Sequence, residues 1–429
     1  MKQEISNEKK KVKFPFYVVK KMGMAKWKYW TIRVIGILFA FLLAGVVCTL
    51  FAKNKTGFNL GVFFSEMFRG TLDFTDFSEI IDLFATFTIT LLIALALTPA
   101  FKMKFWNIGA EGQILMGCMT AAGIAKFAPS DMPNFLILIF AALGAMVAGV
   151  VWSVIPAIFK AFFNTNETLF TLMMNYIAAL LGGLAISIWV PNGSQSFGIL
   201  NQGTFPEIFD NTGTLVILFG VIIFVAMFFY VKFSKQGYEI AVVGESLNTA
   251  RYIGINIKKV IIRTMIITGA LCGFIGFLIV CGVHTTFADN IVGGKGFTGV
   301  LIAWLGHFEP LEIALFSFLA AFMEQGSGTA ATASSSSSEQ FYAICIGVFF
   351  IIIIACEFFS NYQIKMHLEK DFHEAYDQMN QEKLNNIANI KNGFKRFFAR
   401  VWFYICKPFV FIALLISYNN RKHKEEVRG

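Results

Sequence analysis

The chain has 429 residues, of which 56% are hydrophobic and 15% are charged, and its formal net charge at pH 7 is +9. This composition is too apolar for a soluble domain and indicates a protein that crosses the membrane several times. The basic residues crowd next to hydrophobic segments, which is a topology signal and not the stripe of charge that nucleic acid binding needs. The seven cysteines lie singly in apolar runs without metal-ligand spacing, so we interpret them as small hydrophobic residues.

The first expected membrane helix covers 31–51 and follows a basic segment, 1–30, which places the N-terminus in the cytoplasm. The run lacks a small-residue cleavage site, so we expect a retained helix and not a signal peptide. Nine further apolar stretches bring the expected number of spans to about ten and predict an all-α integral membrane protein. They cover 79–101, 108–126, 134–158, 168–190, 214–233, 260–282, 297–307, 311–326 and 341–360.

The distribution of Lys and Arg supports this order of spans, because most loop charges fall on the cytoplasmic side. The inside set is Lys102, Lys104, Lys160, Lys235, Lys258 and Lys259. The loop 191–213 contains neither Lys nor Arg and falls outside. Four residues fall outside and oppose the assignment: Lys53, Lys55, Arg69 and Lys295.

The eighth stretch, 297–307, is too short to cross the membrane alone and follows Gly293-Gly294-Lys295-Gly296. Short or broken helices beside glycines are typical of transporters, in which irregular backbone lines a cavity away from lipid. Two ordinary helices with a different boundary remain the alternative.

Beyond residue 360 the chain becomes polar, so we divide it into a basic segment (1–30), a transmembrane domain (31–360) and a cytoplasmic tail (361–429). Apolar residues from Ile387 to Trp402 recur at helical spacing with basic residues between them, which predicts an amphipathic helix on the inner leaflet. The run 401–418 is an alternative eleventh span, interrupted by Lys407 and Pro408. The five serines of 334–338 predict an external loop. Both termini are expected in the cytoplasm.

The sequence contains no G-x-x-x-x-G-K-[ST] loop, no H-E-x-x-H or G-x-S-x-G motif and no paired carboxylates. We therefore expect neither an enzyme nor a P-loop ATPase, and no cofactor bound by this chain. His284 and His307 are isolated near expected membrane boundaries, where histidine is ordinary.

Two polar clusters within the apolar stretches are the candidate functional residues. Asn107 can cap the helix expected from 108, Glu111 near its start should face the bundle interior or the cytoplasmic mouth, and Gln113 lies deeper. Thr168, Thr171 and Asn175 share one helix face, so they either hold helices together or line a path. Cap and packing roles remain an equal alternative for the first cluster.

The internal loop 234–260 contains a short expected helix that begins after Ser246, a good N-cap, and stops at Gly254. A capped helix beneath the membrane favours a docking element for a soluble partner. A helix that only covers the bundle is the alternative.

Four stretches resemble the permease subunits of ABC importers for nucleosides, within the wider group that handles simple sugars and branched-chain amino acids. The stretches are Asn107 to Gln113, Asn166 to Tyr176, Ala250 to Asn256 and Gly293 to Val300, and the resemblance covers about 80–360. It implies a separate ATPase subunit that binds ATP and Mg, a second permease subunit that forms a heterodimer, and an extracellular solute-binding lipoprotein.

The resemblance also implies that the loop helix couples the permease to the ATPase. The residues that carry this role are Gly244, Glu245, Ser246, Asn248, Ala250, Arg251 and Gly254. The sequence departs from the family pattern at Ser246-Leu247, where Asn-Pro is usual, and at Thr249, which replaces an alanine. Serine preserves the cap, so we expect docking to survive.

We expect a translocation path for nucleosides, whose ribose hydroxyls and base edges suit amide and hydroxyl partners and whose flat base suits Trp106 or Tyr176. The expected path residues are Asn107, Glu111, Gln113, Thr168, Thr171, Asn175 and Thr298. Alternatives are an importer of simple sugars or another small solute, an ion-coupled secondary transporter, and an assembly protein built on the basic tail. A secondary transporter would need membrane-embedded carboxylates in both halves, and only Glu111 and Glu324 qualify.

Overall fold

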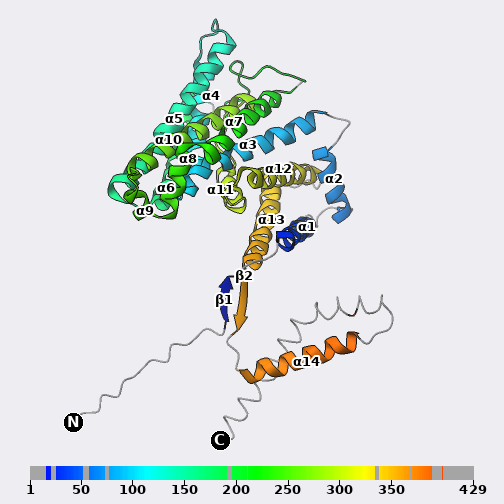
Figure 1. The fold of residues 1–429 in the computed structure, drawn as a ribbon. Helices are drawn as coiled ribbons and strands as arrows, with labels where there is room; N and C mark the ends of the chain where they lie inside the picture. Colours follow the sequence, from blue (N-terminus) through cyan, green and yellow to red (C-terminus); the bar gives the residue numbers. More distant parts are fainter. Residues whose placement is uncertain are drawn as a thin grey trace, which may run out of the picture. The chain divides into compact units, whose positions relative to one another are not determined.

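The residues that the structure describes are mostly helical in a computed structural model (Figure 1), which agrees with the predicted fold class. The structure describes residues 16–20, 26–51, 58–72, 77–190, 196–209, 211–333, 338–366, 370–388 and 399. It divides into a large unit, Trp30–Glu357, and a small unit made of Met1–Tyr29 with Phe358–Gly429.

The helices that build the large unit follow one another in chain order. They are α1 (Lys26–Phe51), α2 (Leu60–Leu72), α3 (Phe77–Lys102), α4 (Ala110–Phe127), α5 (Asn134–Phe163), α6 (Glu167–Trp189), α7 (Gly213–Phe233), α8 (Lys235–Glu245), α9 (Leu247–Tyr252), α10 (Ile257–Leu278), the π-helical turn η1 (Ile279–His284), α11 (Lys295–Leu305), α12 (Pro310–Ala333) and α13 (Ser338–Asn361). Each of the ten expected spans therefore corresponds to a helix.

Seven of the described helices are long and apolar enough to cross a membrane: α1, α3, α5, α6, α7, α10 with η1, and α13. The other three expected spans correspond to α4, α11 and α12. Of these, α4 and α12 carry several polar residues, and α11 is shorter than a bilayer is thick.

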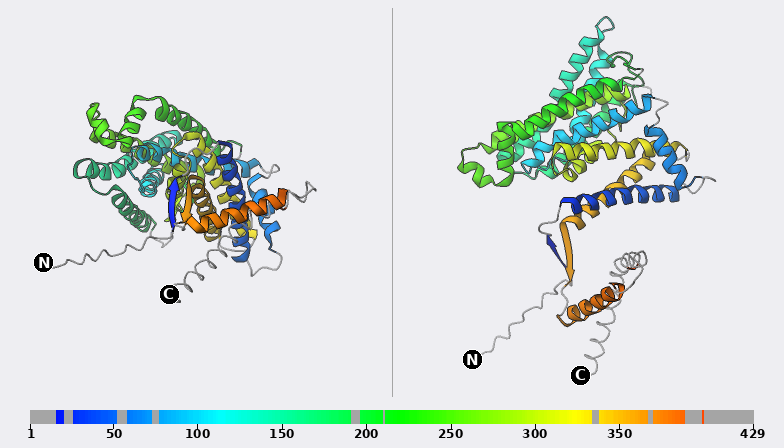
Figure 2. Two further views of the ribbon diagram at one scale, coloured as in Figure 1. Left: turned by 60° about the horizontal axis from the view of Figure 1, so that its bottom comes forward. Right: turned by 45° about the vertical axis from the view of Figure 1, so that its right-hand side comes forward.

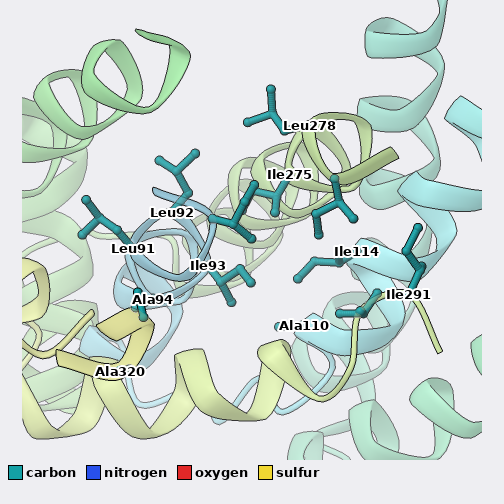
Figure 3. Close-up of a cluster of buried hydrophobic side chains, with 14 of the residues drawn as sticks. Leu91, Leu92, Ile93, Ala94, Ala110, Ile114, Ile275, Leu278, Ile291 and Ala320 are labelled. Carbon is teal, nitrogen blue, oxygen red and sulfur yellow. The ribbon is translucent and has the colours of Figure 1, made fainter. Parts of the chain in front are cut away.

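The core of the bundle surrounds α3 and α10. α3 is buried without interruption from Thr88 to Phe101 and contacts α7, α10, α11 and α12. Figure 3 shows Ile93 of α3 pointing toward side chains of α4 and α10, and Ala94 lying near Ala320 of α12. α5 and α10 meet at Gly149, Gly269 and Gly273, small residues that allow close approach where lipid supplies little hydrophobic driving force.

The short segment before α12 is a separate helix, which confirms the broken-helix prediction. α10 ends in the π-helical turn η1, and residues 285–294 connect it to α11 without helical structure. Ala288 in this connection forms an isolated antiparallel bridge with Ser196, which lies between α6 and α7. The eleven residues of α11 end at Leu305, Gly306 follows as the C-cap, and α12 starts at Pro310.

A second group of helices, α1, α2, α12 and α13, packs through aromatic side chains. The Phe41 ring lies 5.9 Å from that of Phe322 and 5.3 Å from that of Phe349, and both pairs meet edge to face. Figure 2 shows α1 beside α13, and α2 contacts α12. The sequence analysis did not predict α2, which is amphipathic and carries Arg69 in its last turn.

The small unit contains an antiparallel pair of strands that the sequence analysis also missed. β1 (Phe16–Lys20) pairs with β2 (Tyr362–Met366), and α14 (Lys370–Ala388) follows over the polar run. The predicted amphipathic helix lies mostly outside the described residues, as do the run 401–418 and four of the five serines at 334–337. α13 begins at the fifth, Ser338.

Candidate functional site

The turn between α3 and α4 holds the first polar cluster. Asn107 and Gln113 are buried, and their side-chain amides lie 3.3 Å apart, with Gln113 Nε2 donating to Asn107 Oδ1. The same Oδ1 accepts a hydrogen bond from the backbone N–H of Gly109 at 3.0 Å. The predicted cap was therefore wrong in detail: α4 begins at Ala110 and not at 108, and Asn107 closes a turn before the helix instead of capping it.

The cap of α4 comes from a different helix. Asn175 in α6 accepts from the N–H of Gly112 at 2.9 Å and donates to the carbonyl of Ile108 at 2.9 Å. Thr171, one turn earlier, accepts from the N–H of Ile108 at 3.3 Å. Because Gly112 belongs to the first turn of α4, its N–H has no acceptor within the helix. The side-chain oxygen of Asn175 supplies this acceptor.

Glu111 in the first turn of α4 caps a third helix in the same way. Its two carboxylate oxygens accept from the N–H groups of Gly294 at 2.9 Å and Gly296 at 2.7 Å, at the N-terminus of α11. Gly294 adopts a left-handed backbone (φ +79°), and a Cβ on Gly296 would lie 2.5 Å from the backbone nitrogen of Glu111. The α11 macrodipole favours the negative charge at this position.

These contacts connect α6 to the N-terminus of α4, and α4 to the N-terminus of α11. We call the residues that make them the polar junction. The polar junction consists of Asn107, Glu111, Gln113, Thr171 and Asn175. Each of these side chains binds backbone or another member in this structure, which is the packing role that the sequence analysis left open. Their predicted contact with substrate remains a prediction.

The other expected path residues contribute no side-chain hydrogen bond to the polar junction among the bonds described here. Thr168 is half-buried, and its carbonyl accepts from the Thr171 hydroxyl at 3.2 Å. Thr298 is half-buried in α11. Trp106 and Tyr176 are 45% and 61% exposed, so both rings lie on the surface of the isolated chain.

Lys295 and Glu324 form an ion pair that the sequence analysis did not find. Lys295 is the first residue of α11 and binds the carboxylate of Glu324 in α12, and both side chains are largely buried. The topology assignment counted Lys295 as an opposing external charge. In the structure Lys295 is largely buried at the start of a short helix.

The loop between α7 and α10 folds as predicted around Ser246 and Gly254. The Ser246 hydroxyl accepts from the N–H of Thr249 at 3.2 Å and caps α9. Gly254 has φ +83°, its N–H donates to the carbonyl of Arg251, and the N–H of Ile255 donates to the carbonyl of Ala250. This pair of bonds is a Schellman motif, which ends a helix with glycine in the left-handed region.

The residues assigned to coupling divide into a buried and an exposed group. Ala250 is fully buried in a second core cluster with Met103, Phe105 and Val243, so it seats α9 on the bundle and does not face a partner. Gly244 is also buried, against the carbonyl of Lys102. Ser246 and Gly254 shape the helix ends, as described above.

The exposed group can contact another protein. It contains Glu245, Asn248 and Arg251. Tyr252 is 93% exposed and Leu247 is 49% exposed, and the sequence analysis assigned neither to docking. The sequence feature that could have indicated this role was the aromatic Tyr252, close to the glycine that ends the helix.

A cluster of charges surrounds the turn between α11 and α12. Arg33 in α1 is buried and pairs with Glu357 in α13 at 3.1 Å and with Glu312 in α12 at 3.2 Å. His307 in the turn lies 3.1 Å from Glu312 and 3.4 Å from Glu357. The hydrogen bond to Glu357 raises the pKa of His307, burial opposes this, and Glu312 raises it further.

Two lysines fix the other side of this turn. Glu309 accepts from Lys102 at the end of α3 at 3.4 Å and pairs with Lys232 at the end of α7 at 3.1 Å. Burial alone would raise the pKa of Glu309, but the two lysines together outweigh it and lower the pKa. The ends of α1, α3, α7, α11, α12 and α13 thus meet in one charged layer.

Comparison with known proteins identifies the class of this bundle. The family model for the permease component of branched-chain amino acid transport systems matches residues 79–354. The guanosine ABC transporter permease NupP of Bacillus subtilis is 27% identical over 65% of this chain and 81% of its own length. No solved structure matches the chain.

Two further relatives share a similar extent. The nucleoside ABC transporter permease NupB of Lactococcus lactis is 26% identical over 69% of this chain and 83% of its own length. The glucose ABC transporter permease TsgB13 of Haloferax volcanii is 25% identical over 66% of this chain and 78% of its own length. The chain therefore belongs to the family of branched-chain amino acid transport system permease components and is, like these relatives, a permease subunit of an ABC transporter.

Proposed function

We propose that this permease forms the translocation path of an ATP-driven nucleoside importer, together with a second permease subunit. A separate ATPase binds ATP and Mg, and an extracellular lipoprotein delivers the solute. The nucleoside permeases among the relatives support this substrate class, and the glucose relative keeps simple sugars as the alternative.

The observation that carries the coupling proposal is the geometry of α9. A six-residue helix capped at both ends projects Arg251 and Tyr252 into solvent while Ala250 holds it on the ends of α3, α5 and α10. A short helix of this kind can transmit movement from a partner to the bundle, because its base at Ala250 is packed and its tip at Arg251 and Tyr252 is exposed. When the ATPase subunits close on ATP, α9 would move with them and tilt the helices to which its base is attached.

The short helix α11 is the candidate moving element of the path. It is held at its N-terminus by Glu111 and ends at the charged turn that Glu309 anchors. Residues 285–294 before it have no helical structure to resist a tilt. We therefore assign α11 and the polar junction to the wall of the path. An ion-coupled mechanism is less favoured, because Glu111 and Glu324 are both occupied by cap or ion-pair contacts.

The proposal is tested by purifying the tagged permease from its own cells in mild detergent. We expect an ATPase to co-elute with the native chain, and Arg251→Glu to lose it because the charge at the tip of α9 is reversed. Asp131→Lys is the matched control, since it reverses an exposed charge in the α4–α5 turn at the other end of α4. Equal recovery of the ATPase with Arg251→Glu would refute the coupling role.

Substrate class is tested separately, by reconstituting the co-eluting complex and following uptake of radiolabelled guanosine. Unlabelled nucleosides should compete, whereas glucose should not. Competition by glucose alone would transfer the assignment to the sugar alternative without affecting the coupling result.

A further inference from the structure

A pocket of about 900 Å³ lies between α9 and the bundle, separate from the polar junction. Its walls come from the turn after α3, the end of α5, the loop helices α8 and α9, and the start of α10. A volume in this range is typical of small-molecule sites. The proposed path does not account for this pocket, and Arg251 belongs both to its lining and to the exposed tip of α9.

The pocket is basic. Four basic side chains belong to its described lining, against the single carboxylate of Glu245; the basic residues are Lys104, Lys160, Arg251 and Lys258. Lys160 is already paired with Glu167 at 2.8 Å, which leaves three cations from three different elements. Such convergence favours an anionic ligand, because like charges gathered without one repel each other.

Apart from Asn164 and Asn256, the rest of the lining is mostly apolar, and it continues onto the exposed end of α5. Phe105, Val243 and Ile261 line the pocket, and Lys258 Nζ lies 4.5 Å from the centre of the Phe162 ring. Phe162 is 57% exposed at the end of a helix that is one of the seven candidate spans. A ligand with an anionic head and apolar chains would match this combination of surfaces.

We propose that this pocket binds the phosphate headgroup of an anionic phospholipid, with the acyl chains along α5. Lys104 and Lys258 lie at the ends of apolar helices, the level at which basic side chains meet lipid phosphates. Arg251 contributes from α9, so the bound headgroup would link lipid composition to the seat of the coupling helix. The site does not depend on which solute is transported.

Native mass spectrometry of the full-length permease in mild detergent measures this binding directly. The probes are phosphatidylglycerol, phosphatidylcholine as the uncharged comparison, and glycerol phosphate as the soluble source of the same anion. We expect saturable binding of phosphatidylglycerol that weakens with salt, and no such binding of the other two. Lys104→Gln with Lys258→Gln should weaken it roughly 30-fold, since each basic contact contributes about fivefold.

Lys235→Gln with Lys259→Gln is the matched control, because these two lysines line a smaller neighbouring pocket and not this one. Lys104→Arg with Lys258→Arg keeps the charge and should keep binding, which separates loss of the site from loss of the fold. Equal phosphatidylglycerol binding by native chain and glutamine variant would overturn the proposal. Tight binding of glycerol phosphate would assign the pocket to a soluble anion. If the glutamine variant lost a co-eluting ATPase but still bound lipid, the pocket would be assigned to an acidic protein segment.

Discussion

Replacement of Glu111 by glutamine tests whether α4 holds the N-terminus of α11. The carboxylate accepts two N–H hydrogen bonds, from Gly294 and Gly296, and glutamine of the same shape offers only one acceptor oxygen. A hydrogen bond to a charged group contributes about 1.5–3 kcal/mol, and a negative charge at a helix N-terminus about 0.3–1 kcal/mol. Loss of one bond and of the charge should destabilise the local structure by roughly 2–4 kcal/mol.

Hydrogen exchange read by mass spectrometry reports this change at the affected amides. In Glu111→Gln, peptides that contain Gly294 and Gly296 should exchange roughly 30- to 700-fold faster, because each 1.4 kcal/mol is a factor of ten. Glu324→Gln is the control: it removes the ion-pair partner of Lys295 but leaves both cap bonds. Unchanged exchange in Glu111→Gln would show that the carboxylate does not hold α11.

Asn175→Ala should lower solute uptake while the ATPase still co-purifies, since it leaves the N–H of Gly112 and the carbonyl of Ile108 unpaired, at about 1–3 kcal/mol for each group; normal uptake would remove Asn175 from the path. His307 should stabilise the folded chain at low pH, because a raised folded pKa means that the charged form is favoured in the native state. This contribution is complete below the unfolded pKa of about 6.5 and disappears as the pH rises through the folded pKa. Melting curves of native chain and His307→Gln should therefore converge with rising pH, and a constant difference would contradict this account.

Local signals explain what the sequence predicted well. Ser246 and Gly254 fix the ends of α9 through contacts within a few residues, so residue type and spacing were sufficient. The same holds for the short helix after Gly294, where glycines mark the break. These features depend on backbone geometry, which neighbouring residues determine.

Contacts between segments that are distant in the sequence explain the features that the sequence did not predict. Asn107 precedes α4 and is chemically a good cap, yet the cap comes from Asn175, which no local pattern connects to Gly112. The ion pair of Lys295 with Glu324 and the burial of Ala250 likewise depend on which helices pack together. The polar residues were found, but their partners required the fold.

The pairing of β1 with β2 has a consequence for how this protein is made. β1 emerges from the ribosome before all the described helices, and β2 emerges after α13. The strands can meet only if both remain on one side of the bilayer, which requires an even number of membrane crossings between them. A chain in which one helix fails to insert would separate the strands by the thickness of the membrane. The two-stranded sheet can therefore close only on chains with an even number of inserted helices between Lys20 and Tyr362.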